Sequence, residues 1–513
     1  MYNLTYEDGI YFAPDDSCEM YLINWSESCP EAITLQDLET CFDDNKLNQN
    51  ELIPCEDGFE SVFDDSVFTS TVVTEWQLVC GNSWIDAAIS TIFMTGLLFG
   101  VSIFGPIMDK YGRKRAIQIA AIGLVLVQIP LIFIPEAATV WTYAALRFLS
   151  AVFVIACGTA AFVYATEIVG LKWRTWFGVE TQGMFSVGYM FLSLIGYIFP
   201  DWQNQMIVIA IAPCVYIFIF YWLLPTSAAW LFSVGKTAEG REVVQQWSKK
   251  YPTANIDETF IDQLEHSVQQ KMANAPSGTY SQLDLFKPPR MRIVTIVEMY
   301  QWFATTLVYY GLSFGAGNLG GSVLMNNFFN GLVEFVAYIF LPGFIDLKVI
   351  GRKYGTVVTM GIGATGCILT GVFDSLSEGD EESTYFMLKK IFAFVGKFGV
   401  AGTFGIVYVH ASELYPTPIR GIGVGISSAG GRIGGILAPL VNSLYSTYSW
   451  LPYIIFGTVG IIQVVTVFLL PETLGVPMLT TIEEAEEFYR KGKIDKSTEV
   501  EKDNVEDEGT SSL

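Results

Sequence analysis

Long apolar segments alternate with short polar ones along most of the chain. Eleven of them are long enough for a membrane span, because a helix needs about 20 mostly apolar residues to cross a bilayer. They cover residues 84–108, 116–135, 139–165, 176–199, 203–224, 292–314, 321–346, 354–373, 386–411, 419–446 and 448–470. Charged residues make up only 16% of the 513 residues, which is too few to cover the surface of a soluble protein of this length. The pattern predicts an all-α integral membrane protein with eleven spans.

The charges of the polar connections predict the orientation of these spans. Every second connection contains Lys or Arg, and the connections between them contain neither. The basic connections are 109–115, 167–174, 225–291, 346–353 and 413–420. Because basic loops stay on the cytoplasmic side, we expect residues 1–83 outside the cell and the C-terminus in the cytoplasm.

Residues 1–83 form a distinct acidic region. Eighteen acidic residues and one lysine give it a net charge of −17, out of −23 for the whole chain, which argues against nucleic acid as a partner. The region holds two glycosylation sequons, at Asn3 and Asn24, and five of the eight cysteines. The cysteines are Cys18, Cys29, Cys41, Cys55 and Cys80. Since N-glycans and disulfides form on the extracellular side, we expect a glycosylated extracellular region. The alternative is a disordered tail with unpaired thiols.

The chain is thereby divided into five regions. They are the acidic extracellular region (1–83), a five-span bundle (84–224), a cytoplasmic linker (225–291), a six-span bundle (292–470) and a cytoplasmic tail (471–513). In the linker, Thr237–Lys250 and Ile256–Met272 have the periodicity of short amphipathic helices.

The two bundles repeat the same charged motifs at their cytoplasmic ends. The spacing E-x6-R occurs at Glu167 and again at Glu413, and a D-G-R-K motif begins at Asp109 and again at Asp346. Parallel repeats of six helices are the construction of major facilitator transporters. Five spans before the linker and six after it imply that the opening helix of the first repeat is absent from this sequence.

Six stretches of the chain carry a specific resemblance. They are STVVTEWQLVC before Trp84, GPIMDKYGRKR from Gly105, YYGLSFGAGNLGG from Tyr309, LVEFVAY from Leu332, GKFGVAGTFGIVYVHASELYPTPIRGIGVGISS from Gly396 and LPETLGVPMLTTIEEAEEF from Leu470. They resemble the organic cation, anion and zwitterion transporters of solute carrier family 22, within the major facilitator superfamily. The resemblance implies two pseudo-repeated six-helix bundles in the plasma membrane and transport by alternating access without a cofactor. It leaves sodium coupling and the oligomeric state open. Family members open with a helix and a cysteine-rich extracellular loop, and this sequence begins inside that loop.

Two motifs depart from the family pattern. The P-E-S-P-R-W-L stretch of the family reads PTSAAWL at Pro225–Leu231, without its acid and its base. The second D-x2-G-R motif is lengthened to Asp346-x4-Gly351-Arg352. Because both motifs tether inner loops to helix ends, we expect a weaker inner gate.

Arg432 is the clearest candidate for substrate binding. It lies about 13 residues from either end of its predicted span, which places it roughly 20 Å from each surface. A charged group at that depth costs about 2.5 kcal/mol or more, so its guanidinium should face water, an acid or a ligand carboxylate. The structural alternative is an ion pair with a buried acid such as Glu334 or Glu298.

The resemblance also implies a class of substrate. Arg at position 432 is typical of family members that carry anions or the zwitterion carnitine, and Tyr338 is typical of carnitine-type members. Further aromatic residues are implied to line the central cavity, where they would attract quaternary ammonium groups. They are Trp302, Tyr309, Tyr310, Phe404 and Tyr408. The alternative is that these rings only pack helices together. Lys397 either faces the cavity or pairs with a Glu of a neighbouring helix.

A group of residues with cytoplasmic positions resembles the inner-gate network of the superfamily. They are Asp109, Gly112, Arg113, Arg147, Glu167, Arg174, Glu413 and Arg420. Such charge pairs form in the outward-facing state and separate when the two bundles rock. The alternative is a set of ordinary interfacial salt bridges of little energetic value.

The leading prediction is a carrier of small organic cations or carnitine-like zwitterions. One alternative is an organic anion transporter of the same family. Another is a non-transporting membrane receptor or partner, because the first helix is absent from the sequence. His266 and His410 offer neither a metal-binding pair nor a catalytic triad, so neither a metal site nor an enzyme is expected.

Overall fold

The computed structural model describes most of the chain from residue 68 onward. The described residues are 19–21, 52–54, 68–135, 138–168, 171–223, 225–250, 259, 261–263, 265–266, 281–377, 380, 382–476, 479 and 481–491. Strands β1 (Glu19–Tyr21) and β2 (Leu52–Pro54) pair antiparallel. The predicted glycosylation sites Asn3 and Asn24 lie outside the described residues, and so do the first four cysteines.

A first bundle of helices follows the N-terminal region. Its members are α4 (Trp84–Tyr111), α5 (Arg113–Ile132), α6 (Val140–Ile168), α7 (Leu171–Ile198) and α8 (Trp202–Phe218), which continues as a π-turn over Ile219–Leu223. The single turn α3 (Val72–Glu75) leads into them. Its start is fixed by Thr71, whose side chain accepts a hydrogen bond from the N–H of Thr74.

A second bundle follows the linker. Its members are α12 (Pro289–Phe314), α13 (Val323–Ile345), α14 (Gly351–Ser377), α15 (Thr384–Leu414), α16 (Arg420–Asn442) and α17 (Leu451–Thr466). Short 3-10 turns cover Cys80–Asn82, Gln282–Leu285, Gly315–Leu319, Thr417–Ile419, Ser443–Ser446 and Val467–Leu469.

Each predicted span coincides with one helix of the two bundles. Within the described residues, eight helices are long and apolar enough to cross a membrane. The bundle helices outside this group are α7, α8 and α12. α8 is apolar but has only 17 residues before its π-turn. α12 contains several polar residues, which reduce its mean hydropathy. They are buried inside the bundle, and Thr295, Glu298 and Gln301 are among them.

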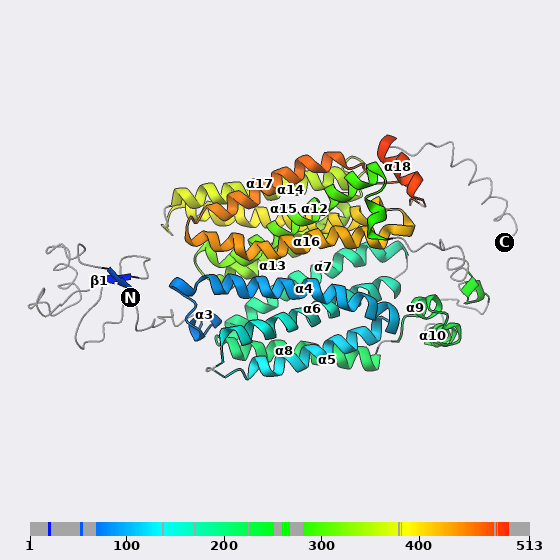
Figure 1. Cartoon of the computed structure of the whole chain (residues 1–513), viewed down its shortest axis with the longest axis horizontal. Coiled ribbons are helices and arrows are strands. Elements are labelled where there is room, and N and C mark those ends of the chain that lie inside the picture. The colour runs from blue at the N-terminus through cyan, green and yellow to red at the C-terminus, as the bar shows by residue number, and fades with distance from the viewer. Residues whose placement is uncertain are drawn as a thin grey trace, which may run out of the picture.

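The helices of both bundles lie side by side, as Figure 1 shows. Within the first bundle α6 packs against α4 and α5, and within the second α14 packs against α15 and α17. Two helix pairs form the main contacts between the bundles: α4 packs on α16, and α7 packs on α13. These pairs fix the space between the bundles.

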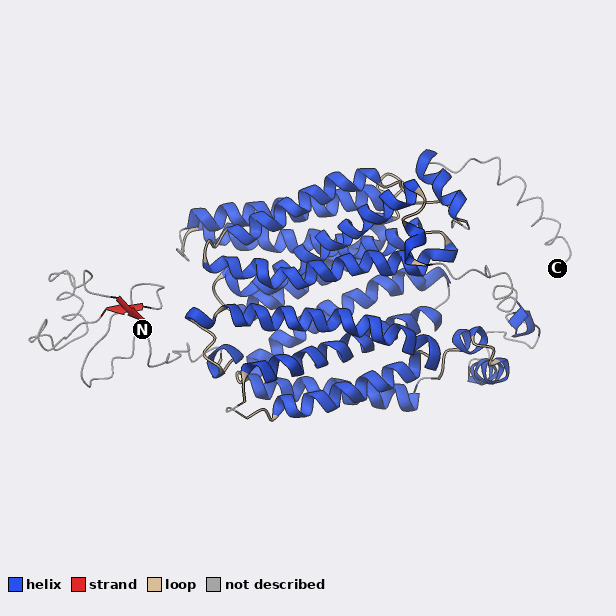
Figure 2. Ribbon diagram, in the orientation of Figure 1, coloured by secondary structure: helices blue, strands red, loops and turns tan. Residues whose placement is uncertain are grey.

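The short helices of the linker and of the C-terminal region gather at one end of the structure (Figures 1 and 2). α9 (Ala228–Ser233), α10 (Thr237–Lys250) and α18 (Ile482–Lys491) lie beyond the helix ends there. We call this the basic end; it is the end at which α4 ends and α5 begins. α10 confirms the amphipathic helix predicted for the same residues, whereas most of the second predicted linker helix lies outside the described residues.

Candidate functional site

A cavity of about 320 Å³ lies between the two bundles. The first bundle lines it with Val101, Ile155, Gly158, Thr159, Phe162, Thr181, Gln182 and Phe185. The second bundle lines it with Trp302, Tyr309, Tyr310, Phe404, Tyr408, Val424, Ser428 and Arg432. Six of the eight predicted substrate-binding residues therefore surround one cavity.

The position of the cavity along the helices is defined by contacts between the bundles. Phe162 lies in the second half of α6 and Val424 in the first turns of α16, both on the side of the basic end. On the other side of the cavity the bundles meet, where the Thr91 hydroxyl of α4 donates to the carbonyl of Ile436 at 3.4 Å. The cavity therefore lies on the basic side of the contact between α4 and α16.

Aromatic rings of α12 and α15 form one wall of the cavity. The rings of Trp302 and Tyr408 meet edge to face with centroids 4.4 Å apart. Phe404 lies between Tyr408 and Tyr309, at centroid distances of 5.6 and 4.9 Å. Tyr310 continues the series at 5.2 Å from Tyr309. Such a series offers several aromatic faces to a cationic group.

Arg432 faces this aromatic wall from α16. The backbones of α16 and α12 are in close contact, since a Cβ on Gly430 or Gly434 would lie within 2.4 Å of a carbonyl oxygen of α12. Among the described residues Arg432 is half-buried and makes no hydrogen bond or ion pair. The two acids considered as structural partners, Glu334 and Glu298, have other neighbours. A guanidinium in this position has its donors free for water or for a ligand carboxylate.

Tyr338 and Lys397 lie behind the cavity wall and not on it. The Lys397 ammonium is 3.1 Å from the Glu334 carboxylate and donates to the Ser313 hydroxyl at 2.7 Å. It also lies 3.5 Å from the centre of the Tyr309 ring, whose hydroxyl donates to Glu334 at 2.6 Å. Lys397 and Glu334 are each 1% exposed. Of the two alternatives for Lys397, the structure therefore shows the pair with a glutamate.

The basic end of the first bundle holds a charge cluster that we call the first clamp. Its guanidinium, from Arg113, lies 2.7 Å from Glu167 and 3.2 Å from Asp109 and also donates to the carbonyl of Met108. Gly112 makes the turn between α4 and α5 with a φ of 87°, and the ring of Trp230 packs against it. The Trp230 indole N–H donates to the carbonyl of Asp109 at 2.9 Å.

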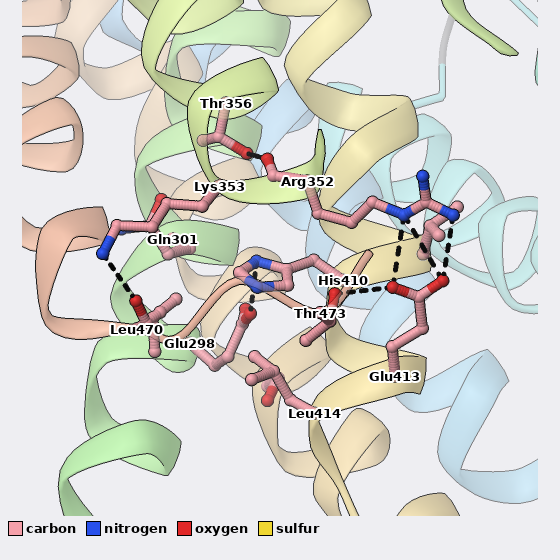
Figure 3. Close-up of polar contacts among 12 residues, drawn as sticks. Glu298, Gln301, Arg352, Lys353, Thr356, His410, Glu413, Leu414, Leu470 and Thr473 are labelled. Carbon is pink, nitrogen blue, oxygen red and sulfur yellow. Dashed lines mark hydrogen bonds and ion pairs between the residues drawn. The ribbon is translucent and has the colours of Figure 1, made fainter. Parts of the chain in front are cut away.

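The second bundle repeats this arrangement as the second clamp, and Figure 3 shows its contacts of Glu413 with Arg352 and Thr473. Arg352 binds Glu413 at 3.1 Å and Asp346 at 2.9 Å. Glu413 also accepts a hydrogen bond from the Thr473 hydroxyl at 2.6 Å. Glu472 accepts the backbone N–H groups of Arg352 and Lys353 at 2.9 and 3.0 Å, so it caps the start of α14.

The expectation of a weaker inner gate is not supported at either departing motif. In the first, Trp230 keeps the loop after α8 bound to the end of α4, without the acid and base that the motif lacks. In the second, the two additional residues leave Arg352 within reach of both Asp346 and Glu413. Gly351 has a φ of 62°, and a Cβ there would lie 2.5 Å from the Glu472 carboxylate, so the turn depends on glycine.

Comparison with known proteins identifies the family. The sequence profile of the sugar (and other) transporter family matches residues 57–487. Solute carrier family 22 member 16 of Bos taurus is 32% identical over 93% of this chain and 81% of its own length. The human organic cation/carnitine transporter 2 is 32% identical over 86% of this chain and 76% of its own length. The chain belongs to solute carrier family 22.

The fold of this carrier agrees with that assignment. The xylose transporter XylE from E. coli, in an inward open conformation, superposes with a TM-score of 0.59 over 83% of this chain and 93% of its own, at 15% identity. The predicted all-α major facilitator fold is thereby confirmed. This member of solute carrier family 22 is a membrane transporter of small organic molecules.

The prediction that Arg147 belongs to the inner-gate network is wrong. Arg147 lies only seven residues into α6, which begins at the end opposite the basic end. It is twenty residues from Glu167, or roughly 30 Å along the helix, and its guanidinium lies over the ring of Phe93 at 4.8 Å. Arg147 therefore cannot belong to the first clamp.

Of the remaining predicted gate residues, Arg174 and Arg420, the structure describes the side chain of Arg420. Arg174 lies in α7, where its side chain is outside the described part of the structure. Arg420 donates to the carbonyl of Tyr415 at 3.3 Å, while Glu413 binds Arg352. Each clamp is internal to its own bundle, so the described pairs brace the bundles and do not join them. A gating role for these residues stays a prediction.

Sequence reasoning missed two groups of residues at this end. Glu472 and Thr473 lie in a stretch used only for the family resemblance, although Glu472 fixes the start of α14. The sequence did not predict that Glu298 and His410 are neighbours. Glu298 was a candidate ion-pair partner for Arg432, and His410 had no predicted role. The structure places them side by side (Figure 3).

Proposed function

We propose that this carrier moves small organic cations and carnitine-like zwitterions across the plasma membrane by alternating access. The observation that carries the proposal is the unpaired guanidinium of Arg432 in the same cavity as the aromatic wall. A carboxylate can accept two hydrogen bonds from an arginine, and a quaternary ammonium is attracted to aromatic faces. One ligand that bears both groups would therefore engage Arg432 and the aromatic wall together.

The charge balance around the cavity favours this class over a dianion. Lys397 adds no free positive charge, because Glu334 neutralises it. Arg432 is then the one described cation among the residues that line the cavity. The volume of about 320 Å³ is within the usual range for sites of small molecules. The human relative named for organic cations and carnitine supports the same class of substrate.

The proposed state is inward-facing, with the basic end in the cytoplasm. The bundles meet on the side of the cavity away from the basic end, through Thr91 and Ile436. Basic residues concentrate at the basic end, as expected for a cytoplasmic face. Rocking about the α4–α16 and α7–α13 contacts would close this end and open the other.

The proposal is tested by uptake of two tracers that differ by one carboxylate. Cells expressing the carrier would be given carnitine, a zwitterion, or tetraethylammonium, a simple cation. Arg432→Ala should reduce carnitine uptake about 10- to 100-fold, the scale of a charged hydrogen bond, and leave tetraethylammonium uptake within about twofold. Arg432→Lys should restore little, because lysine lacks the forked geometry.

The matched control is Arg490→Ala, the same change at an exposed arginine of α18. All variants are compared at equal surface expression. An equal loss of both tracers in Arg432→Ala would contradict the proposed role in charge selection.

A further inference from the structure

Two titratable side chains face each other in the interior of the second bundle. Glu298 of α12 is 1% exposed and His410 of α15 is 2% exposed. The carboxylate oxygen Oε1 of Glu298 lies 3.6 Å from Nδ1 of His410 (Figure 3). Neither carboxylate oxygen of Glu298 has a hydrogen-bond partner among the described residues. A bare carboxylate in such a place is costly.

The hydrogen bonding of His410 determines whether its Nδ1 atom presents a lone pair or a hydrogen to the Glu298 carboxylate. The other ring nitrogen, Nε2, lies 3.2 Å from the carbonyl oxygen of Pro471. A carbonyl only accepts hydrogen bonds, so Nε2 carries a hydrogen and donates it. If the ring is neutral, Nδ1 then presents a lone pair to the Glu298 oxygen. One added proton between the two atoms turns this repulsion into a hydrogen bond and cancels the buried charge.

Other buried acids of this bundle are neutralised differently. Glu334 is paired with Lys397, and Asp374 is paired with Lys389. Each of these acids is paired with a lysine ammonium, and Glu298 has no lysine or arginine partner among the described residues. A proton shared with His410 would supply the compensating positive charge for Glu298.

The charged and titratable groups around the pair have partners of their own. On the side of Glu298, the Tyr415 hydroxyl bonds with Ser427 and the Tyr489 hydroxyl with the carbonyl of Leu414. On the side of His410 lie Arg352, Lys353 and Glu472. Arg352 binds Glu413, Lys353 donates to the carbonyls of Phe468 and Leu470, and Glu472 caps α14. α17 contains no charged residue, and the arginines of α16 are Arg420, bonded to Tyr415, and Arg432, which faces the cavity.

The pair lies next to the aromatic wall, on the side of the basic end. Trp302 is one helical turn from Glu298 on α12, and Tyr408 is two residues before His410 on α15. Their rings, 4.4 Å apart, join the same two helices that the Glu298–His410 pair joins. A ligand that changes the spacing of these rings therefore changes the distance across which a proton is shared.

We propose that Glu298 and His410 form a proton-binding site whose occupancy is coupled to substrate binding in the cavity. The coupling rests on the proposed function, whereas the proton site itself does not. The proton comes from water and returns to it, and no bond between heavy atoms changes. By linkage, a substrate that changes proton affinity has its own affinity changed by the same factor.

Infrared spectroscopy of the purified carrier tests the proton site without any transport. A protonated carboxylic acid has a carbonyl stretch that a carboxylate lacks. The wild-type protein should show this band at about pH 6 and lose intensity as the pH rises to about pH 9. Glu298→Gln should remove that band from the difference spectrum, and the exposed control Glu239→Gln should retain it.

Absence of a titrating band in the wild-type protein would overturn the proposal. The same conclusion would follow if the band persisted unchanged in Glu298→Gln. The wild-type titration decides the question even if the variant does not fold.

The pH profile of tracer uptake tests the coupling. Wild-type uptake should change at least about twofold between about pH 6 and about pH 8.5, since a single site titrates over one to two pH units. Glu298→Gln, whose amide donates to Nδ1 as the shared proton does, should give a nearly flat profile. A variant profile that follows the wild type would overturn the coupling. If no tracer enters any variant, the proposed function fails while the infrared result still decides the proton site.

Discussion

The two bundles of the carrier are alike at the basic end and different in the membrane interior. Both hold an arginine against a glutamate and an aspartate at the junction of two helices, Arg113 in the first clamp and Arg352 in the second. The described ion pairs between fully buried side chains, by contrast, all belong to the second bundle. The interior of the first bundle packs small apolar residues such as Ala120 and Ala156.

The same difference is found in the residues that each bundle contributes to the cavity lining. The first bundle contributes apolar and neutral polar residues to the lining, and the second contributes Arg432 and five aromatic rings. The described charged residue of the lining and the buried titratable pairs therefore lie in one bundle. The first bundle serves as the opposite wall, and the two clamps brace both bundles alike.

Breaking a buried pair of the second bundle should have the largest effect. Lys397→Ala leaves Glu334 as an unpaired charge in the interior and should reduce the free energy of unfolding by about 3 to 5 kcal/mol. Surface expression and the melting temperature of purified protein measure the loss. The double change Lys397→Met with Glu334→Gln should recover much of it, because no bare charge is left.

The control for this change is Lys236→Ala, which removes a lysine that is half exposed on the linker. It should leave the melting temperature nearly unchanged. If Lys397→Ala were as mild as this control, the buried pair would not stabilise the second bundle.

The two clamps should differ in strength although they share a design. Arg352 has a side chain only 8% exposed and binds two acids and the carbonyl of Ile345, so Arg352→Ala should cost about 2 to 4 kcal/mol. Arg113 is 16% exposed and one of its acids, Asp109, faces solvent, so Arg113→Ala should cost about 1 to 2 kcal/mol. Melting temperatures of the two purified variants give the comparison. The reverse order would show that burial does not set the strength of the clamps.

The smallest effect is expected at the opposite end of the first bundle. Asp201 accepts hydrogen bonds from the Ser70 hydroxyl at 2.5 Å and from the N–H of Asn204 at 2.9 Å, which caps α8. Partial burial raises the pKa of Asp201, but hydrogen bonds from Ser70 and the backbone outweigh it and hold the pKa below 3.8. The stabilisation is therefore present at neutral pH and is lost as the pH falls through that lowered value. Asp201→Asn should cost about 1 kcal/mol or less.

Thermal unfolding of Asp201→Asn at about pH 7 and about pH 3 checks this account. The difference from the wild-type protein should shrink at the lower pH. A difference that grows on acidification would contradict the assigned direction of the pKa.

Much of this organisation could be predicted from single residues and their spacing. Apolar segments gave the position of every bundle helix, since hydrophobicity acts locally along the chain. The isolation of Arg432 in an apolar span predicted that its guanidinium faces water, an acid or a ligand, and it lines the cavity. The i, i+4 spacing of Phe404 and Tyr408 placed both rings on one face. These features need only the geometry of one helix.

What could not be predicted depends on which helices touch. Glu298 and His410 are 112 positions apart in the sequence, and their pairing follows from the packing of α12 on α15. The same is true of Lys397, for which the sequence offered several glutamates. Arg147 was misplaced because a charged residue was assigned by resemblance and not by its distance from the start of α6.

The central claim is that one ligand binds Arg432 and the aromatic wall at the same time. An experimental structure of the carrier with bound carnitine tests it most directly. The account predicts the carboxylate within hydrogen-bond distance of the Arg432 guanidinium and the ammonium against the rings of Trp302, Tyr309 or Tyr408. A ligand bound elsewhere, or with its ammonium next to Arg432, would contradict the account.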